Sequence, residues 1–248
     1  MPPGYLHLLP SGYNEGDACF PVIYMLHGLG GSAGDWLAHT RIARHAAPYP
    51  FLLIFPDADS SWYTDSADGA SRWGHRFLTE MMPDVEARFR TVSRREGRGL
   101  IGLSMGGFGA CRLALAHPDR FAAAASHSGS LMKAREETPP DAPHPVFGDP
   151  RRDAAHRRAN DPFVLAERLA GSPGLPALYL DCGLKDHLLE ANRAFHARLE
   201  RLGVPHAYAE RPGYHTWPYW NRAVRHSLEW MAAHLVGSRP CPPAAAPR

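Results

Sequence analysis

The sequence predicts an α/β fold, in which a mostly parallel central sheet carries helices on both faces. Short uninterrupted apolar runs, typical of strands buried on both faces, alternate with longer segments whose apolar residues recur at helical spacing. Several of these runs end in glycine-rich turns, where the chain leaves a sheet easily. With 248 residues the chain is long enough to bury one large core.

The first predicted strands lie at residues 22–26 and 51–55. The strand at 22–26 opens into the glycine-rich loop 27–31. An oxyanion site needs two fixed N–H donors, and in this kind of fold one of them comes from such a loop. We therefore expect the amide of Leu29 to be one donor. The other expected donor is the amide of Met105, which directly follows Ser104 and is the first residue of a predicted helix.

Residues 98–103 form a short apolar strand that runs straight into Ser104. Gly102 and Gly106 stand two residues before and after this serine, where side chains would collide with a sharp strand-to-helix turn. An apolar helix is expected over residues 108–117. This glycine-x-serine-x-glycine pattern in a strand–turn–helix setting is the nucleophile elbow of the α/β-hydrolase fold. It predicts that Ser104 is a nucleophile.

A serine hydroxyl needs a histidine to take its proton and a carboxylate to orient that histidine. Asp186 follows the predicted strand 178–182, and His215 lies in a loop after the predicted strand 206–210, with a helix at 188–202 between them. The chain order serine, acid, histidine is the order of this fold. Both side chains are expected at the carboxyl ends of parallel strands, where Ser104 also lies.

Two other residues compete for roles at this edge. Asp181 is an alternative acid, but it lies inside an apolar strand, whereas Asp186 follows a turn, so we assign the acid to Asp186. Among fifteen histidines, only His215 combines a loop, a preceding strand and the right chain order. His127 follows the predicted strand 121–125, and we expect it to line the pocket without doing chemistry.

Bulky aromatic residues are expected at the same edge. Trp62 and Tyr63 follow the strand at 51–55, and Trp217 lies beside His215. Such side chains would narrow a pocket and form a flat apolar wall, which favours short or compact acyl groups. For Trp217, core packing is a nearly equal alternative.

The motifs together resemble the putative esterase (esterase D-like) family of α/β-hydrolases, over nearly the whole chain. The matching segments are 27–32, 35–36, 56–57 with 61–65, 102–109, 182–183 with 186, and 213–220. The family includes tributyrin-type carboxylesterases, feruloyl and acetylxylan esterases, S-formylglutathione hydrolases and antigen 85 mycolyltransferases, and the small bacterial tributyrin or feruloyl branch looks closest. By position, the resemblance implies nucleophile Ser104, acid Asp186, base His215 and oxyanion amides Leu29 and Met105.

The first residues of this sequence differ from the usual pattern of the family. Family members usually begin with a hairpin before the segment that matches residues 9–13, and only eight residues precede that segment in this sequence. We therefore expect the first edge strand of the sheet to be missing.

Composition and charge exclude several classes. A net charge of +2 without a basic stripe gives no reason to expect a nucleic-acid or membrane partner. No secretory signal and no apolar stretch of membrane-spanning length is evident, so a cytoplasmic location is expected. The four cysteines have no paired spacing and no metal-binding histidine motif occurs, so neither a disulfide framework, a metal site nor a cofactor is expected.

The chain is expected to form one domain over residues 1–236. Residues 130–170 are too polar for core elements, and we expect either a short cap over the pocket or an ordinary surface excursion, with a helix at 161–169. Residues 237–248 are rich in proline and are expected to be a disordered tail.

The sequence therefore predicts a serine carboxylesterase that hydrolyses short or compact acyl esters of small molecules through an acyl-enzyme. Three alternatives stay open. An acyltransferase of the mycolyltransferase kind would use the same triad, as would a thioesterase of the S-formylglutathione hydrolase kind. A catalytically silent binding module on this fold is the third.

Overall fold

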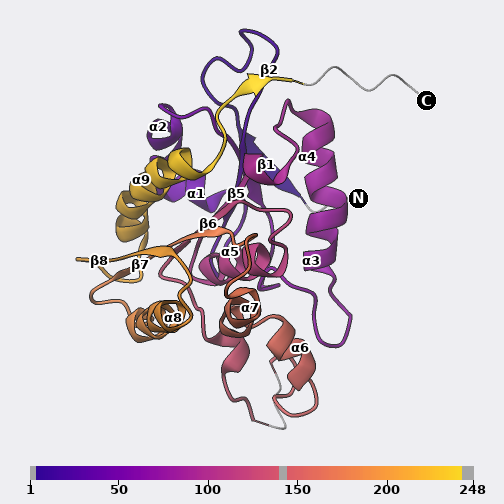
Figure 1. Cartoon of the computed structure of the whole chain (residues 1–248), viewed down its shortest axis with the longest axis vertical. Coiled ribbons are helices and arrows are strands. Elements are labelled where there is room, and N and C mark those ends of the chain that lie inside the picture. The colour runs from indigo at the N-terminus through magenta and orange to yellow at the C-terminus, as the bar shows by residue number, and fades with distance from the viewer. Residues whose placement is uncertain (1–3, 140–143, 242–248) are drawn as a thin grey trace.

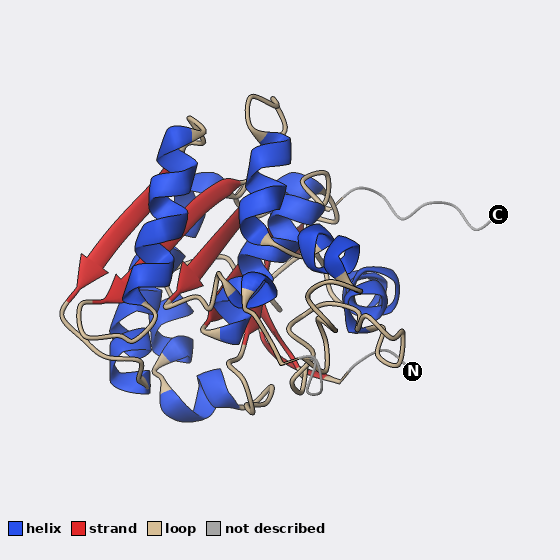
Figure 2. Cartoon of the chain, turned by 90° about the horizontal axis from the view of Figure 1, so that it is seen from below, coloured by secondary structure: helices blue, strands red, loops and turns tan. Residues whose placement is uncertain are grey.

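The computed structural model describes residues 4–139 and 144–241. In these residues a seven-stranded sheet runs in the order β1-β4-β3-β5-β6-β7-β8. Every neighbouring pair in it is parallel except β1 with β4. The sheet is enclosed by helices on both faces (Figures 1 and 2). The predicted α/β-hydrolase architecture is confirmed.

The elements follow one another in the alternating order expected of this fold. The strands of the main sheet are β1 (Tyr5–Leu8), β3 (Val22–Leu26), β4 (Leu52–Pro56), β5 (Arg98–Leu103), β6 (Ala123–His127), β7 (Ala177–Gly183) and β8 (His206–Arg211). The helices are α1 (Asp35–His39), α2 (Ile42–Ala46), α3 (Trp73–Arg76), α4 (Met82–Arg88), α5 (Met105–Ala116), α6 (Ala154–Ala159), α7 (Pro162–Leu169), α8 (Leu189–Arg201) and α9 (Trp217–His234). A π-helical turn, Phe77–Met81, joins α3 to α4, and short 3₁₀ turns lie at Arg95–Gly97 and Lys133–Arg135.

The sheet divides the core into two clusters because side chains alternate along each strand. In β3, Val22, Tyr24 and Leu26 point to one face, where α3, α4, α5, α7 and α8 pack. Ile23 and Met25 point to the other face, which α1, α2 and α9 cover. Burying each such side chain stabilises the fold by about 1.5–3 kcal/mol. This double burial explains the uninterrupted apolar runs in the sequence.

One edge of the sheet differs from the expectation. The first edge strand is present: β1 pairs antiparallel with β4, with Tyr5 opposite Pro56 and Leu8 opposite Leu53. The hydroxyl of Tyr5 donates to Asp84 of α4 at 2.6 Å, which fastens this edge to the helix beside it.

In the described residues, no helix combines the length and apolarity needed to cross a membrane.

The polar segment at 130–170 contributes to the core despite its composition. Phe147 and Phe163 are buried in the cluster that contains α5 and α7. Arg157 is also buried, and its guanidinium donates to the carbonyl oxygens of Glu136 and Gly148. The expected helix is α7, Pro162–Leu169, and the residue before it, Asp161, caps it by accepting the Phe163 amide at 2.9 Å. Residues 140–143 of this segment lie outside the described residues.

The expectation of no disulfide is wrong. Cys19 and Cys241 form a disulfide between positions 222 residues apart in the sequence. Beside it, β2 (Ala18–Cys19) pairs antiparallel with β9 (Arg239–Pro240) as a second, two-stranded sheet (Figure 1). Cysteines so distant in sequence show no spacing pattern, which is why the sequence did not reveal the pair.

The same bond corrects the expected tail. Residues 237–241 are held by the disulfide and by β9, so the first part of the predicted disordered segment is fixed to the domain. The remaining tail residues, 242–248, lie outside the described residues.

A disulfide that closes so long a loop should contribute measurably to stability, typically about 2–4 kcal/mol. We expect Cys241→Ser to lower the melting temperature by roughly 5–15 °C in non-reducing buffer, measured by circular dichroism. In a strong reductant the wild type and the variant should have the same melting temperature. Equal melting temperatures without reductant would contradict a stabilising bond.

Candidate active site

Ser104 lies at the turn between β5 and α5 in a backbone conformation that few non-glycine residues adopt. Its φ is 53° and its ψ is −116°. Such strain costs of order 1–3 kcal/mol and persists only where the surroundings impose it. Two backbone bonds hold the turn: the Ser104 amide donates to the carbonyl of His127 at 3.0 Å, and its carbonyl accepts the Ser130 amide at 3.1 Å.

The two glycines of the motif are required by close backbone contacts. A Cβ atom on Gly102 would collide with the carbonyl of Gly106, and a Cβ atom on Gly106 would collide with the carbonyl of Leu26 in β3. Both obstacles are backbone atoms, so no side-chain rotation relieves them. The sequence pattern therefore reflects a helix that begins directly against the sheet.

The structure brings the three predicted catalytic side chains into one hydrogen-bonded chain. His215 Nε2 lies 3.0 Å from Ser104 Oγ. His215 Nδ1 lies 3.1 and 2.9 Å from the two carboxylate oxygens of Asp186. Asp186 follows β7 and His215 follows β8, so neighbouring parallel strands deliver both to the edge where Ser104 stands.

The Asp186 side chain has no solvent exposure. Burial alone would raise the pKa of this carboxyl, but hydrogen bonds from His215, the Leu188 amide and the Ser128 hydroxyl together lower it below its ordinary value. Asp186 is therefore ionised at neutral pH. An ionised acid accepts the Nδ1 proton of His215 and leaves Nε2 free to accept a proton from Ser104.

The two expected oxyanion donors flank this chain. Met105 is the first residue of α5, directly after Ser104, and Leu29 lies in the loop after β3. In the part of the chain that the structure describes, neither amide donates to a backbone carbonyl. Both are thus available to an oxygen that develops negative charge near Ser104.

Buried contacts hold the Leu29 loop in place. The hydroxyl of Tyr63 donates to the carbonyl of His27 at 2.8 Å. His27 Nε2 accepts the amide of Ala58 at 3.0 Å, so its other nitrogen, Nδ1, carries the proton and donates to the Gly28 carbonyl at 2.8 Å. The position of the loop is therefore set by the strand and loop that precede α3.

Three of the four expected pocket residues are not at the surface. Trp62 is 5% exposed and packs on Phe108 and Phe147, while Tyr63 and His127 are fully buried. Trp62 and Tyr63 do not form the exposed wall that the sequence suggested, because the 61–63 turn packs against α5. Trp217 is half-buried, stacks on His39 and contacts Trp220 edge to face.

Other large apolar side chains lie close in sequence to the residues of the site and are exposed. We call Leu29, Met132, Leu184 and Tyr214 the rim residues; each is a large hydrophobic side chain with 38–59% of its surface exposed. Leu29 carries an expected oxyanion amide, Leu184 lies two residues before Asp186, and Tyr214 immediately precedes His215. The sequence positions of Leu29, Leu184 and Tyr214, at or beside predicted site residues, are the signal by which the sequence could have indicated them.

Asp186 and His215 also belong to the one group of potential metal ligands found in the described residues. Its third member is the exposed His187, whose Nδ1 lies 3.7 Å from Asp186. Because two of the three groups already bond each other within the triad, the arrangement is explained without a metal.

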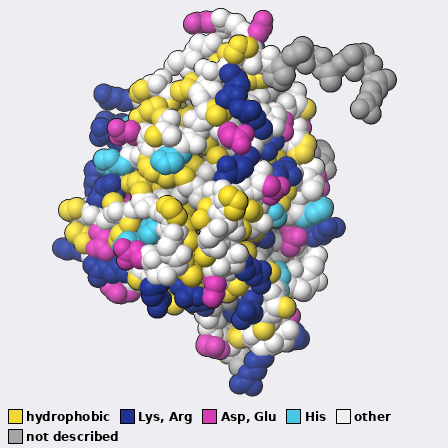
Figure 3. Space-filling model, viewed as in Figure 1, with side chains coloured by type: hydrophobic (Ala, Val, Ile, Leu, Met, Phe, Trp, Pro, Cys, Tyr) yellow, Lys and Arg dark blue, Asp and Glu magenta, His cyan; other side chains and the backbone are white. Residues whose placement is uncertain are grey.

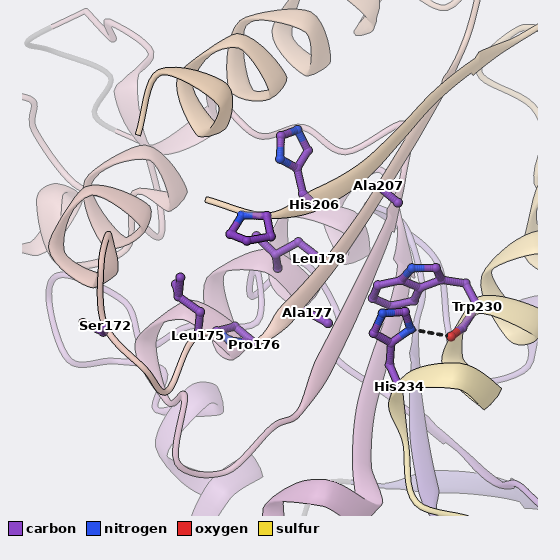
Figure 4. A pocket seen from close by; sticks show the side chains of 10 residues that line it. Ser172, Leu175, Pro176, Ala177, Leu178, His206, Ala207, Trp230 and His234 are labelled. Atoms are coloured by element: carbon purple, nitrogen blue, oxygen red, sulfur yellow. Dashed lines mark hydrogen bonds between the residues drawn. The ribbon is translucent and has the colours of Figure 1, made fainter. Parts of the chain in front are cut away.

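A hollow of about 620 Å³ lies far from the triad along the same strands (Figure 4). It is lined by Leu178 and His206, at the beginning of β7 and β8, and by Trp230 and His234 of α9. The triad follows the opposite, carboxyl ends of these strands. This hollow is therefore separate from the candidate active site.

Comparisons with known proteins relate this chain to esterases. The family model described as "Putative esterase" matches residues 3–231. The chain is 30% identical over 239 residues to Esterase Rv1288 of Mycobacterium tuberculosis, covering 86% of this chain and 52% of that protein. It is 28% identical over 230 residues to an acetyl esterase of Caldicellulosiruptor saccharolyticus, covering 85% of this chain and 83% of that one.

Solved structures show the same fold. The serine hydrolase FphF of Staphylococcus aureus, solved with bound substrate, superposes with a TM-score of 0.78 at 25% identity, over 94% of this chain and 99% of that one. The chain spans about half the length of the mycobacterial esterase that it matches. Because the family match covers more than half of the chain, this protein belongs to the putative esterase family of α/β-hydrolases.

Proposed function

We propose that this protein is a serine carboxylesterase that hydrolyses short or compact acyl esters through an acyl-enzyme. The observation that carries the proposal is the unbroken chain from Ser104 Oγ through His215 to Asp186, with contacts of 2.9–3.1 Å. A serine, a base and an orienting acid at hydrogen-bond distance are what nucleophilic catalysis on an acyl carbon requires.

The residues act in two steps. Ser104 Oγ attacks the acyl carbon as its proton passes to His215 Nε2, and the amides of Leu29 and Met105 stabilise the oxyanion. His215 then protonates the departing alcohol, and the acyl group stays on Ser104. In the second step water attacks this ester as its proton passes to His215, and His215 then returns the proton to Ser104 Oγ as the acid leaves. Asp186 stabilises the imidazolium that forms each time.

The rim residues give the site an apolar surface for the substrate. Exposed apolar side chains gathered around a polar centre are typical of ligand-binding grooves. The match to an acetyl esterase supports a small acyl group, with the alcohol part lying on the rim.

Acyl transfer to an alcohol or hydrolysis of a thioester would use the same residues. Transfer differs only in what occupies the position of the attacking water. The family contains both kinds of enzyme, and rates measured with alcohol acceptors and with thioesters distinguish them from simple hydrolysis. A silent binding module would turn over none of these substrates.

A cytoplasmic location, expected from the sequence, conflicts with the Cys19–Cys241 disulfide. Disulfides persist mainly in oxidising compartments and are rare in the reducing cytosol. We therefore propose that the protein works in an oxidising compartment, where the Cys19–Cys241 bond persists. Small-molecule esters are the proposed partners. Basic and acidic side chains lie interspersed on the face drawn in Figure 3.

Removal of the nucleophile tests the proposal most simply. We expect Ser104→Ala to fold normally and to lower kcat for p-nitrophenyl acetate by about 10⁴-fold or more. Circular dichroism checks the fold, and the steady-state rate checks the chemistry. Wild-type turnover in the pure variant would discard the assignment of Ser104.

The two aspartates should respond differently. Asp186→Asn is expected to lower kcat by about 10⁴-fold, because an amide in place of the carboxylate favours the wrong tautomer of His215. Asp181→Asn, remote from Ser104, should cost only about tenfold in kcat, with an added loss of stability. The reverse order in the two kcat values would show that the acid is misassigned.

The pH profile follows from the charge states of the site. Asp186, whose pKa is lowered, stays ionised through mildly acidic pH. Titration of Asp186 should therefore contribute no change in kcat/KM from mildly acidic to neutral pH. Activity should be unchanged by a chelator. Loss of activity on chelation would point instead to a metal hydrolase.

A further inference from the structure

A second serine–histidine–aspartate arrangement lies in the buried interior of the protein. His127 Nδ1 is 3.0 Å from both carboxylate oxygens of Asp181, and His127 Nε2 is 2.9 Å from Ser227 Oγ. His127 lies at the end of β6, Asp181 lies in β7, and Ser227 lies in the middle of α9. Their contacts match those of the catalytic triad to within about 0.1 Å.

This buried arrangement is not a second active site. All three residues have no solvent exposure, so no ester reaches Ser227. Ser227 lies within a helix rather than at an elbow, and its hydroxyl also bonds the carbonyl of Val224 at 3.1 Å. A nucleophile needs open space for the reacting atom next to oxyanion donors, and here packed side chains fill that space.

Asp181 is the centre of the arrangement. Its carboxylate accepts the hydroxyl of Tyr219 at 3.0 Å and lies 3.5 Å from the guanidinium of Arg211, in addition to its contact with His127. A buried carboxylate is tolerated only when it is paired and hydrogen-bonded. The partners of Asp181 lie on β6, on β8 and in the first turn of α9, so its charge binds these three elements together.

Two of these elements, β6 and α9, also contact residues of the catalytic triad. The carbonyl of His127 accepts the Ser104 amide at 3.0 Å, and the carbonyl of Asp181 accepts the Ser128 amide at 2.7 Å. Ser128 in turn accepts the indole N–H of Trp220 at 3.2 Å, and the Trp220 ring contacts the catalytic His215 edge to face, with centroids 4.9 Å apart.

We propose that His127, Asp181 and Ser227 are positioning residues, a buried relay that fixes the end of β6 and the start of α9 and so sets the distance between Ser104 and His215. The proposal rests on the function proposed above. Catalytic rate is sensitive to small displacements of the reacting groups, whereas binding of a small ester on the exposed rim is not. Loosening the relay should therefore lower kcat and leave KM nearly unchanged.

Ser227→Ala tests the relay because it removes only the hydroxyl that meets His127 Nε2. We expect kcat for p-nitrophenyl acetate to fall about tenfold, which corresponds to about 1.4 kcal/mol in the barrier. KM should stay within about twofold of the wild type. Ser227→Thr keeps a hydroxyl and should restore kcat. Ser126→Ala removes an equally buried serine hydroxyl next to the relay and is the matched control, expected at the wild-type rate.

All rates are measured well below the melting temperature of each variant, so that loss of folded protein does not enter. A wild-type kcat in Ser227→Ala, accompanied only by a lower melting temperature, would overturn the proposal. An equal loss of kcat in Ser227→Thr or in Ser126→Ala would overturn it as well. Should Ser227→Ala fail to fold, Tyr219→Phe removes one bond to Asp181 and carries the same test.

Ser104→Ala, measured in parallel, separates this proposal from the proposed function. Full activity in Ser104→Ala would overturn the proposed function. An inactive Ser104→Ala together with a normal kcat in folded Ser227→Ala or Tyr219→Phe would overturn the relay alone.

Discussion

The parallel, in-register pairing of β5, β6 and β7 is the constraint on which the site depends. Leu103 pairs with His127, and His127 pairs with Asp181, so one row crosses three strands just below the edge where Ser104 emerges. Parallel strands end together, and loops that follow them meet at one edge. A one-residue slip of β6 would turn His127 to the other face of the sheet and separate it from Asp181.

Rigid packing around this row of residues fixes the position of Ser104, whose backbone is strained. The backbone of Ser104 stays in an unfavourable conformation because Gly102 and Gly106 allow α5 to begin against the sheet. The strain is tolerated in a fold with two large apolar clusters, one on each face. The position of Ser104 thus rests on packing that is mostly remote from it, and the buried contacts of His127 with Asp181 and Ser227 add polar interactions to that packing.

The sequence is informative wherever function and backbone geometry impose the same residues. The elbow needs two glycines and the triad needs a fixed chain order, so the amino-acid pattern alone predicts that Ser104, Asp186 and His215 lie near one another. Contacts between residues remote in the sequence carry no such pattern. The Cys19–Cys241 bond is one example, and the pairing of His127 with Ser227 is another. The prediction for Trp62 is wrong for a related reason, since its neighbours Phe108 and Phe147 come from distant segments.

The most direct measurement of the central claim is the identity of the residue that carries the acyl group. Enzyme mixed rapidly with excess p-nitrophenyl acetate and quenched in acid during the first turnover would be digested and mapped by mass spectrometry. The account predicts one acetyl group per enzyme, on Ser104 Oγ, formed with a burst of p-nitrophenol. An acetyl group on another residue, or turnover by folded enzyme that neither shows a burst nor yields a Ser104 adduct with a fluorophosphonate, would contradict it.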